Sequence, residues 1–234
     1  MICRVADLIV EIPEAGGMAP RCKDYRCITD DPPDIIIREE LYNYSRYPEL
    51  SKEIVAYNHS GMQFYKQLLE IDGMMLHSSA VVYDGYAYLF SGPSRVGKST
   101  HTGLWTEVFE DAVIINDDKP ALRNINGKWH AYGTTWSGKH PINKDIKAPV
   151  AGICILERGE GSAIELLSPK EAFIEIFAQS TRYQLNEKRM DCLLGHISSI
   201  IENIPIYKMH CTPDISSVEL SYNTMRRGAE ERGL

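Results

Sequence analysis

The segment that decides the fold lies near the middle of the chain and reads Phe90-Ser91-Gly92-Pro93-Ser94-Arg95-Val96-Gly97-Lys98-Ser99-Thr100. It fits the pattern G-x-x-x-x-G-K-[ST], in which a glycine-rich loop directs its backbone N–H groups at the phosphates of a nucleotide. The two fixed glycines allow backbone conformations that a β-carbon would resist. Residues 92–100 are therefore predicted to be a phosphate-binding loop.

The last two fixed positions of the pattern, Lys98 and Ser99, have side chains that can contact a nucleotide and its metal ion. The ammonium of Lys98 would bring a positive charge to the β- and γ-phosphates, and the hydroxyl of Ser99 is a ligand for Mg²⁺. The flanking segments have the required character: residues 86–90 form an apolar and aromatic run typical of a strand, and residues 98–109 repeat large apolar side chains at helical spacing. The positive end of that helix dipole would point at the same site.

The composition of the chain limits the classes of protein it can be. Its 234 residues are 44% apolar and 24% charged, an ordinary globular composition for one large domain or two small ones. The net charge of −7 argues against a nonspecific nucleic-acid partner, because such proteins carry a basic face. No apolar run approaches the length of a membrane span, and Asp7 and Glu11 interrupt any signal-peptide core. We expect a cytoplasmic protein with no nucleic-acid or membrane partner.

The cysteines do not form a recognisable metal or redox motif. A metal site built from Cys22, Cys27 and a distant histidine is an open alternative, but the spacing is not a zinc signature. We favour reduced thiols with a structural role. The six cysteines are Cys3, Cys22, Cys27, Cys154, Cys192 and Cys211.

Residues 1–70 carry no recognisable motif and are predicted to be accessory strands and a helix packed on a phosphate-loop domain at 71–234. Pro48 would lie in the first turn of the helix, where its missing N–H costs nothing. Asp84-Gly85 is a tight-turn signal that pairs the strand before the loop with its antiparallel predecessor. The elements expected before the loop are strands at 5–12 and 34–38, a helix at 47–71, and strands at 75–83 and 86–90.

The second half of the chain alternates strand and helix patterns. Ser168, Pro169 and Glu171 together form a helix start with a capping box. The long segment 133–147 is predicted to be a polar loop, and long loops in compact domains are often functional. The elements expected after the phosphate loop are a helix at 98–109, a strand at 112–116, a hairpin at 121–132, a strand at 150–156, a helix from Ser168, a helix at 186–203, a strand at 204–211 and a helix at 214–227.

A second chemical signal follows the loop, where an apolar strand ends in Asp117 and Asp118. One carboxylate could hold Mg²⁺ through water, and the other could accept a proton from an attacking hydroxyl. Two adjacent carboxylates would repel a triphosphate unless a cation lay between them, so Mg²⁺ is implied. The alternative is a solvated turn before Pro120.

Two further candidates come from segments on either side. Strand pairing across the tight turn brings His77 level with the phosphate loop, as a possible neighbour of the γ-phosphate; the alternative is a hydrogen-bonded core histidine. In the long loop, Lys139, next to His140, could stabilise charge on the transferred phosphoryl group, or could be an ordinary solvated lysine. Trp136 of the same loop could offer an apolar face to an acceptor.

The histidine-bearing strand, the loop and the aspartate pair resemble, in this order, the catalytic domain of bacterial HPr kinase/phosphorylase, over about residues 74–215. The resemblance implies an α/β fold of the HPr-kinase/phosphoenolpyruvate-carboxykinase type, with a mixed sheet flanked by helices. It also implies that Lys98 contacts the phosphates, that Ser99 and Asp118 lie near Mg²⁺, that Asp117 is the base and that His77 is the active-site histidine.

Residues 133–138 and 148–159 look more like the HPr-kinase-related proteins of peptide-modification gene clusters, some of which phosphorylate a serine of a ribosomally made peptide. The function expected on these grounds is a Mg²⁺- and ATP-dependent kinase acting on a hydroxyl, either a serine of a peptide or protein or a small-molecule alcohol. A homo-oligomer is possible. Two alternatives stay open: a phosphotransferase similar to phosphoenolpyruvate carboxykinase, and a nucleotide sensor without transfer activity.

Overall fold

The computed structural model describes residues 1–14, 16–138, 141–182 and 185–234. Up to the phosphate loop the helices and strands are β1 (Ile2–Val5), β2 (Leu8–Glu11), α1 (Met18–Arg21), β3 (Ile35–Ile36), α2 (Lys52–Leu68), β4 (Gly73–Met75), β5 (Ser78–Tyr83) and β6 (Tyr86–Ser91). After the loop they are α3 (Lys98–Val108), β7 (Val113–Asp118), β8 (Ala121–Ile125), β9 (Lys128–Tyr132), β10 (Lys147–Arg158), β11 (Ala163–Leu166), α4 (Pro169–Gln179), α5 (Glu187–Asn203), β12 (Ile206–Cys211) and α6 (Ile215–Glu231).

The larger sheet is mixed and is joined at its longest strand. Over the described residues it has nine strands, in the order β4-β8-β9-β10-β6-β5-β7, with β12 also paired to β10 and β11 paired to β12. The first residues of β10 pair antiparallel with β9, while its later residues pair parallel with β6 and β12. The predicted mixed sheet flanked by helices is therefore confirmed.

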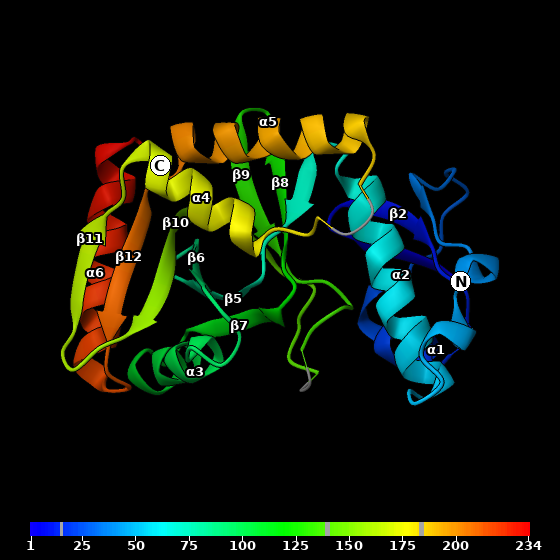
Figure 1. Cartoon of the computed structure of the whole chain (residues 1–234), viewed down its shortest axis with the longest axis horizontal. Coiled ribbons are helices and arrows are strands. Elements are labelled where there is room, and N and C mark those ends of the chain that lie inside the picture. The colour runs from blue at the N-terminus through cyan, green and yellow to red at the C-terminus, as the bar shows by residue number, and fades with distance from the viewer. Residues whose placement is uncertain (15, 139–140, 183–184) are drawn as a thin grey trace.

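Alternation along the strands divides the core of this sheet into two layers. On β6, Ala87 and Leu89 belong to a cluster covered by α4 and α5, whereas Tyr88 and Phe90 belong to a cluster covered by α3 and α6. Successive side chains of a strand point to opposite faces of the sheet. A continuous run of apolar residues, as at 87–90, is therefore typical of a strand that is buried on both faces. Figure 1 shows α4 and α5 along one side of the sheet and α3 on the other.

The N-terminal part has its own three-stranded sheet, in the order β1-β2-β3, with α2 beside it. Its apolar residues form one cluster with Ala121, Tyr132 and Trp136 of the larger part. Polar contacts cross the same boundary: Arg123 donates to the Ala6 carbonyl at 2.9 Å, and the Tyr132 hydroxyl donates to Asp7 at 2.8 Å. The proposed division at residue 70 therefore separates two sheets that share a buried core.

Three predicted elements before the loop are wrong in extent. The range predicted as one strand, 5–12, instead contains the end of β1, a tight turn and β2. Ala6 and Asp7 have positive φ values, 54° and 60°, and turn the chain back between the two strands. The helix at 47–71 begins at Lys52, after Ser51, whose side chain accepts from the Ile54 N–H. The strand at 75–83 is broken between β4 and β5, which pair with different neighbours.

The segment after β9 also differs from its prediction. Residues 133–137 are buried, and the Trp136 side chain is only 1% exposed. Its ring stacks on Phe64 of α2 with centroids 4.7 Å apart, and its N–H donates to Ser60 at 2.9 Å. Trp136 therefore holds α2 against the sheet and has no exposed face for an acceptor. The short strand β11 was not predicted either.

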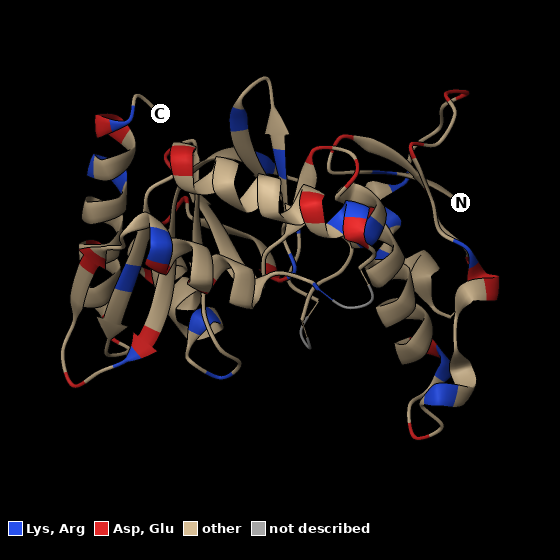
Figure 2. Ribbon diagram, turned by 45° about the horizontal axis from the view of Figure 1, so that its top comes forward, with Lys and Arg blue, Asp and Glu red and all other residues tan. Residues whose placement is uncertain are grey.

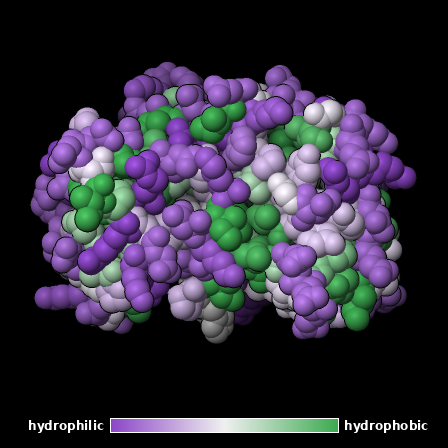
Figure 3. Space-filling view, turned by 180° about the vertical axis from the view of Figure 1, so that it is seen from behind, coloured by the Kyte–Doolittle hydropathy of each residue, from purple (hydrophilic) through white to green (hydrophobic). Residues whose placement is uncertain are grey.

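The surface of the molecule is mainly hydrophilic. Figure 3 shows one face on which apolar side chains gather in separate patches between hydrophilic ones. Across the part of the chain that the structure describes, no helix combines the length and apolarity needed to cross a bilayer.

Two glycine-to-alanine substitutions should change stability in opposite directions. A Cβ on Gly133 would lie 1.7 Å from the Lys144 carbonyl oxygen and 2.6 Å from that of Ile115, so Gly133→Ala should lower the free energy of unfolding by roughly 1–3 kcal/mol or more. Gly195 is exposed on α5, where an added Cβ would meet open space, so Gly195→Ala should raise it by about 0.5–1 kcal/mol. Urea denaturation of both variants measures this; equal effects would contradict the close approach at Gly133.

Candidate functional site

Strand pairing places the phosphate loop and the two aspartates at one edge of the sheet. Strand β5 lies between β6 and β7 and runs antiparallel to both, so β6 and β7 point the same way. Ser78, the first residue of β5, pairs with Ser91 on one side and with Asp118 on the other. The loop leaves β6 at Ser91, and therefore its first glycine lies level with the carboxylates.

The loop has the backbone of a phosphate cradle. Gly92 and Gly97 have φ values of 137° and 120°, which L side chains rarely adopt, and a Cβ on Gly92 would lie 2.9 Å from the Leu156 carbonyl oxygen. Arg95 also has positive φ, at 67°. The loop ends at α3, whose first N–H groups are unpaired within the helix. These features fit an anionic ligand such as the phosphates of ATP.

Lys98 is buried at the base of the cradle. Its ammonium donates to the carbonyls of Gly92, at 3.0 Å, and Pro93, at 3.2 Å. Burial lowers the pKa of this ammonium from its ordinary value, and the carboxylates of Asp118 and Asp117 oppose that shift in part. A phosphate oxygen would be a stronger acceptor than either carbonyl, so this charge is well placed for a nucleotide.

Ser99 and Asp117 lie together at the mouth of the loop. The Ser99 hydroxyl donates to a carboxylate oxygen of Asp117 at 3.0 Å, and the Asp117 side chain is buried while Ser99 is exposed. A hydroxyl and a carboxylate are hard oxygen ligands, and Mg²⁺ is usually held by one or two protein groups, waters and substrate phosphates. Among the described residues no group of three or more His, Cys, Asp and Glu side chains could hold a metal alone. The pair therefore fits a Mg²⁺ that arrives with phosphates.

Asp118 is held by two cationic or polar partners and not by Ser99. His77 Nε2 contacts one of its carboxylate oxygens at 3.0 Å, and the Lys119 ammonium contacts the other. Burial by itself would raise the pKa of the Asp118 carboxyl, but the hydrogen bond from His77 and the adjacent Lys119 outweigh it and lower the pKa well below its usual range. Asp118 also has a φ of 106°, a strained conformation for a residue with a Cβ.

The position of His77 is fixed from both sides. Its backbone N–H donates to the Gln179 carbonyl at 2.9 Å, and Nδ1 lies 3.3 Å from the Gln179 side-chain oxygen at the end of α4. The Ser91 hydroxyl donates to the His77 carbonyl at 2.8 Å. Nε2 is thereby directed at Asp118, so the predicted histidine lies at the site as a partner of the second aspartate.

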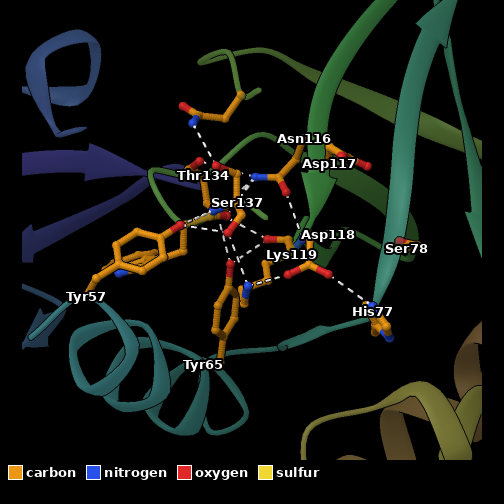
Figure 4. A network of polar contacts seen from close by, with 12 residues as sticks. Tyr57, Tyr65, His77, Ser78, Asn116, Asp117, Asp118, Lys119, Thr134 and Ser137 are labelled. Atoms are coloured by element: carbon orange, nitrogen blue, oxygen red, sulfur yellow. Dashed lines mark hydrogen bonds and ion pairs between the residues drawn. The ribbon is translucent and has the colours of Figure 1, made fainter. Parts of the chain in front are cut away.

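A network of side chains that the sequence did not point to surrounds this pair (Figure 4). The Asn116 amide donates to the Trp136 carbonyl at 2.9 Å, and its oxygen accepts from the Lys119 N–H at 2.8 Å. The Lys119 ammonium also donates to the Ser137 carbonyl at 3.1 Å. Asn116 and Lys119 both flank the aspartate pair in the sequence, but their neighbours along the chain do not reveal these contacts, which depend on the packing of residues 134–137.

Two tyrosines of α2 extend the network from the N-terminal part. The Tyr57 hydroxyl donates to the Ser137 carbonyl at 2.8 Å, and the Tyr65 hydroxyl contacts the Lys119 carbonyl. Burial raises the pKa of the Tyr65 hydroxyl well above its ordinary value, so it stays a donor. No motif marks these tyrosines, because only the packing of α2 brings them to the site.

The remaining predicted residues are placed as follows. The loop residues Pro93, Ser94 and Arg95 are exposed, as is Thr100 in the first turn of α3. Lys139 and His140 lie outside the described residues, so the role of Lys139 stays a prediction. Gly138, just before them, donates its N–H to the Asp117 carbonyl at 2.7 Å.

Comparison with known proteins gives a structural likeness only. No family model and no curated protein matches this chain. Among solved structures, it is similar to the HPr(Ser) kinase/phosphatase from Coxiella burnetii, with 12% sequence identity and a TM-score of 0.38, over 68% of this chain and 97% of that one.

The lowered pKa of Asp118 predicts a pH-dependent stability. A carboxyl whose pKa is lower in the folded than in the unfolded state stabilises the fold above the unfolded value, and this contribution is lost as the pH falls toward the folded one. Asp118→Asn should therefore lower the free energy of unfolding at pH 7, and the difference from the unmodified protein should shrink as the pH falls below about 4–5. Urea denaturation across this range measures it. Asp111→Asn, in an exposed turn, is the control; equal pH profiles would contradict the ion pairs at Asp118.

Proposed function

We propose that this chain is a Mg²⁺- and ATP-dependent kinase that transfers the γ-phosphoryl group to a hydroxyl. The observation that carries the proposal is the 3.0 Å contact between Ser99 of the phosphate loop and Asp117, with Asp118 held beside it by His77. A loop serine and a strand-end aspartate are the protein ligands that P-loop enzymes provide for nucleotide-bound Mg²⁺. A second carboxylate next to them suits proton transfer from an acceptor.

The chemistry divides between the ligand and the protein. When bound, Mg²⁺-ATP supplies the phosphoryl group and a cation that offsets its charge. The loop N–H groups and Lys98 bind and orient the phosphates, and Ser99 and Asp117 hold the cation. Since phosphoryl transfer requires little covalent chemistry from the protein, positioning and charge stabilisation are the main contributions expected of these residues.

The contacts favour an assignment of the two aspartates opposite to the one implied by the family resemblance. Asp117 contacts the loop serine and is therefore proposed as the Mg²⁺ ligand. Asp118 points to His77 and Lys119, stays ionised because of them, and is proposed as the group that accepts the hydroxyl proton. His77 would act as a positioning residue, since its Nε2 fixes the carboxylate of Asp118.

The acceptor is proposed to be a serine of a peptide or protein, with a small-molecule alcohol as the alternative. Support comes from the resemblance of residues 133–138 and 148–159 to peptide-modifying relatives. Trp136 is not proposed to contact the acceptor, because its ring is buried against Phe64. Lys139 is still proposed to approach the acceptor.

Lys98→Ala should abolish the stabilisation that ATP confers. A ligand stabilises a protein by mass action only if it binds, and Lys98 contacts two loop carbonyls in addition to its proposed phosphate. The melting temperature without ATP should fall little, while the rise on adding Mg²⁺-ATP should vanish. Differential scanning fluorimetry measures both, with Lys128→Ala at the exposed first position of β9 as the control. A rise as large as that of the unmodified protein would contradict phosphate binding by this loop.

Substitution of each aspartate should separate their roles. Asp117→Asn should raise the Mg²⁺ concentration needed for activity, because an amide is a weaker ligand for a hard cation. Asp118→Asn should leave ATP-induced stabilisation in place and slow phosphate transfer by about 10²–10⁴-fold, because the amide cannot take the acceptor proton. Transfer from [γ-³²P]ATP to serine peptides and to small alcohols measures this. The opposite pattern would restore the assignment implied by the resemblance, and ATP binding without transfer to any acceptor would indicate a sensor.

A further inference from the structure

A cavity lies away from the phosphate loop, between residues 36–50 and helix α2. Its volume is about 820 Å³, which lies in the range typical of small-molecule binding sites. We call it the α2 trough. Its wall is fixed in place: the side-chain amides of Gln63 and Gln67 bind the backbone of Arg38 and Ile36, with donor–acceptor distances of 2.9 and 3.0 Å.

The lining of the α2 trough is basic although the chain as a whole carries a net charge of −7. No Asp or Glu is found among the described residues that line it. Figure 2 shows Lys and Arg segments next to Asp and Glu segments at the start of α5, beside the end of α2. The basic side chains of the lining are Arg38, Arg46, Lys66 and Arg189.

Arg38 and Arg189 of the lining each form an ion pair with a glutamate that lies outside it. Arg38 lies 3.7 Å from Glu40, and Arg189 lies 2.7 Å from Glu70. The pKa of the Lys66 ammonium is lowered from its ordinary value by burial and, to a smaller extent, by the positive charge of Arg189. An anion bound next to Lys66 would favour the charged form of its ammonium and would offset the repulsion from Arg189.

Apolar groups complement the charges at this site. Leu41 is 60% exposed and Leu50 is 36% exposed, and both line the trough together with Met62. Exposed leucines next to basic groups fit a ligand with apolar and acidic groups in alternation, and not a simple inorganic anion.

A smaller cavity shares two lining residues of α2 with the trough. Asn58 and Met62, one turn apart on α2, line both cavities. The second cavity, of about 110 Å³, is also lined by Lys119, whose ammonium contacts Asp118. A chain bound in the trough that extended along α2 past these two residues would approach Lys119 and Asp118.

We propose that the α2 trough binds an acidic segment, interspersed with apolar side chains, of the polypeptide whose serine is phosphorylated. The proposal rests on the proposed kinase function for its link to the serine, but the trough and its charge are independent of that function. The basic groups would select the segment and raise its local concentration, and the reacting serine would lie further along the same chain.

The test uses a fluorescein-labelled synthetic peptide in which pairs of glutamates alternate with leucines and which ends in a serine. A matched peptide carries lysines in place of the glutamates. Fluorescence anisotropy measures binding to the full chain, to Arg46→Glu and to Lys66→Glu, with Lys128→Glu as the control. We expect the acidic peptide alone to bind, each trough variant to weaken it about tenfold, and Lys128→Glu to leave it unchanged. The double variant Arg46→Glu/Lys66→Glu should bind the lysine peptide instead.

Transfer assays then separate this proposal from the kinase function. With the acidic peptide as acceptor, the trough variants should raise KM and leave kcat and ATP-induced stabilisation unchanged. If the peptide binds as expected but is never phosphorylated, the kinase function fails and the trough proposal stands. Binding that is indifferent to Arg46 and Lys66, competition by inorganic phosphate as strong as by peptide, or self-association abolished by Leu41→Asp in sedimentation velocity would each overturn it.

Discussion

The register of β5 between β6 and β7 is the constraint on which the proposed site depends. Because β5 is antiparallel to both neighbours, the phosphate loop and the aspartate pair emerge side by side at its first residue. A slip of one residue would turn every side chain of the slipped strand to the opposite face. Tyr88 and Leu89 face different buried clusters, so such a slip would move the aromatic side chains of β6 into the layer that its smaller side chains now fill. The packing of the two layers thus keeps Ser99 within reach of Asp117.

The parts that could be predicted from the sequence are those decided by neighbouring residues. The phosphate loop, the turn at Asp84-Gly85 and the capping box at Ser168 each depend on backbone conformations that a few adjacent residues fix, and the structure has the turn and the capping box where predicted. The break between β4 and β5 could not be read locally, because it follows from pairing with β8 on one side and with β6 and β7 on the other. Trp136 was misplaced for the same reason: its burial requires α2, which lies far away in sequence.

The N-terminal part contributes directly to the order of the site. Tyr57 and Tyr65 of α2 contact the Ser137 carbonyl and the Lys119 carbonyl, which adjoin Asp118. A buried tyrosine hydroxyl must keep its partner, because an unpaired donor in the interior costs free energy. Movement of α2 would therefore disturb Lys119 and its contact with Asp118. Residues 1–70 are thus coupled to the aspartates by hydrogen bonds and not by packing alone.

The negative charges of Asp117 and Asp118 explain why cationic and polar side chains surround them. Two adjacent carboxylates beside a triphosphate would repel it, and this acidic chain carries no general excess of positive charge to compensate. Compensation is instead local: the Lys98 ammonium lies under the loop and the Lys119 ammonium contacts Asp118, while Ser99 and His77 hold the two carboxylates by polar contacts. Since most of these partners are held by backbone or side-chain contacts, the proposed nucleotide site would be preorganised. Preorganised charges cost little reorganisation at the moment of reaction, and that is the condition under which phosphoryl transfer is accelerated most.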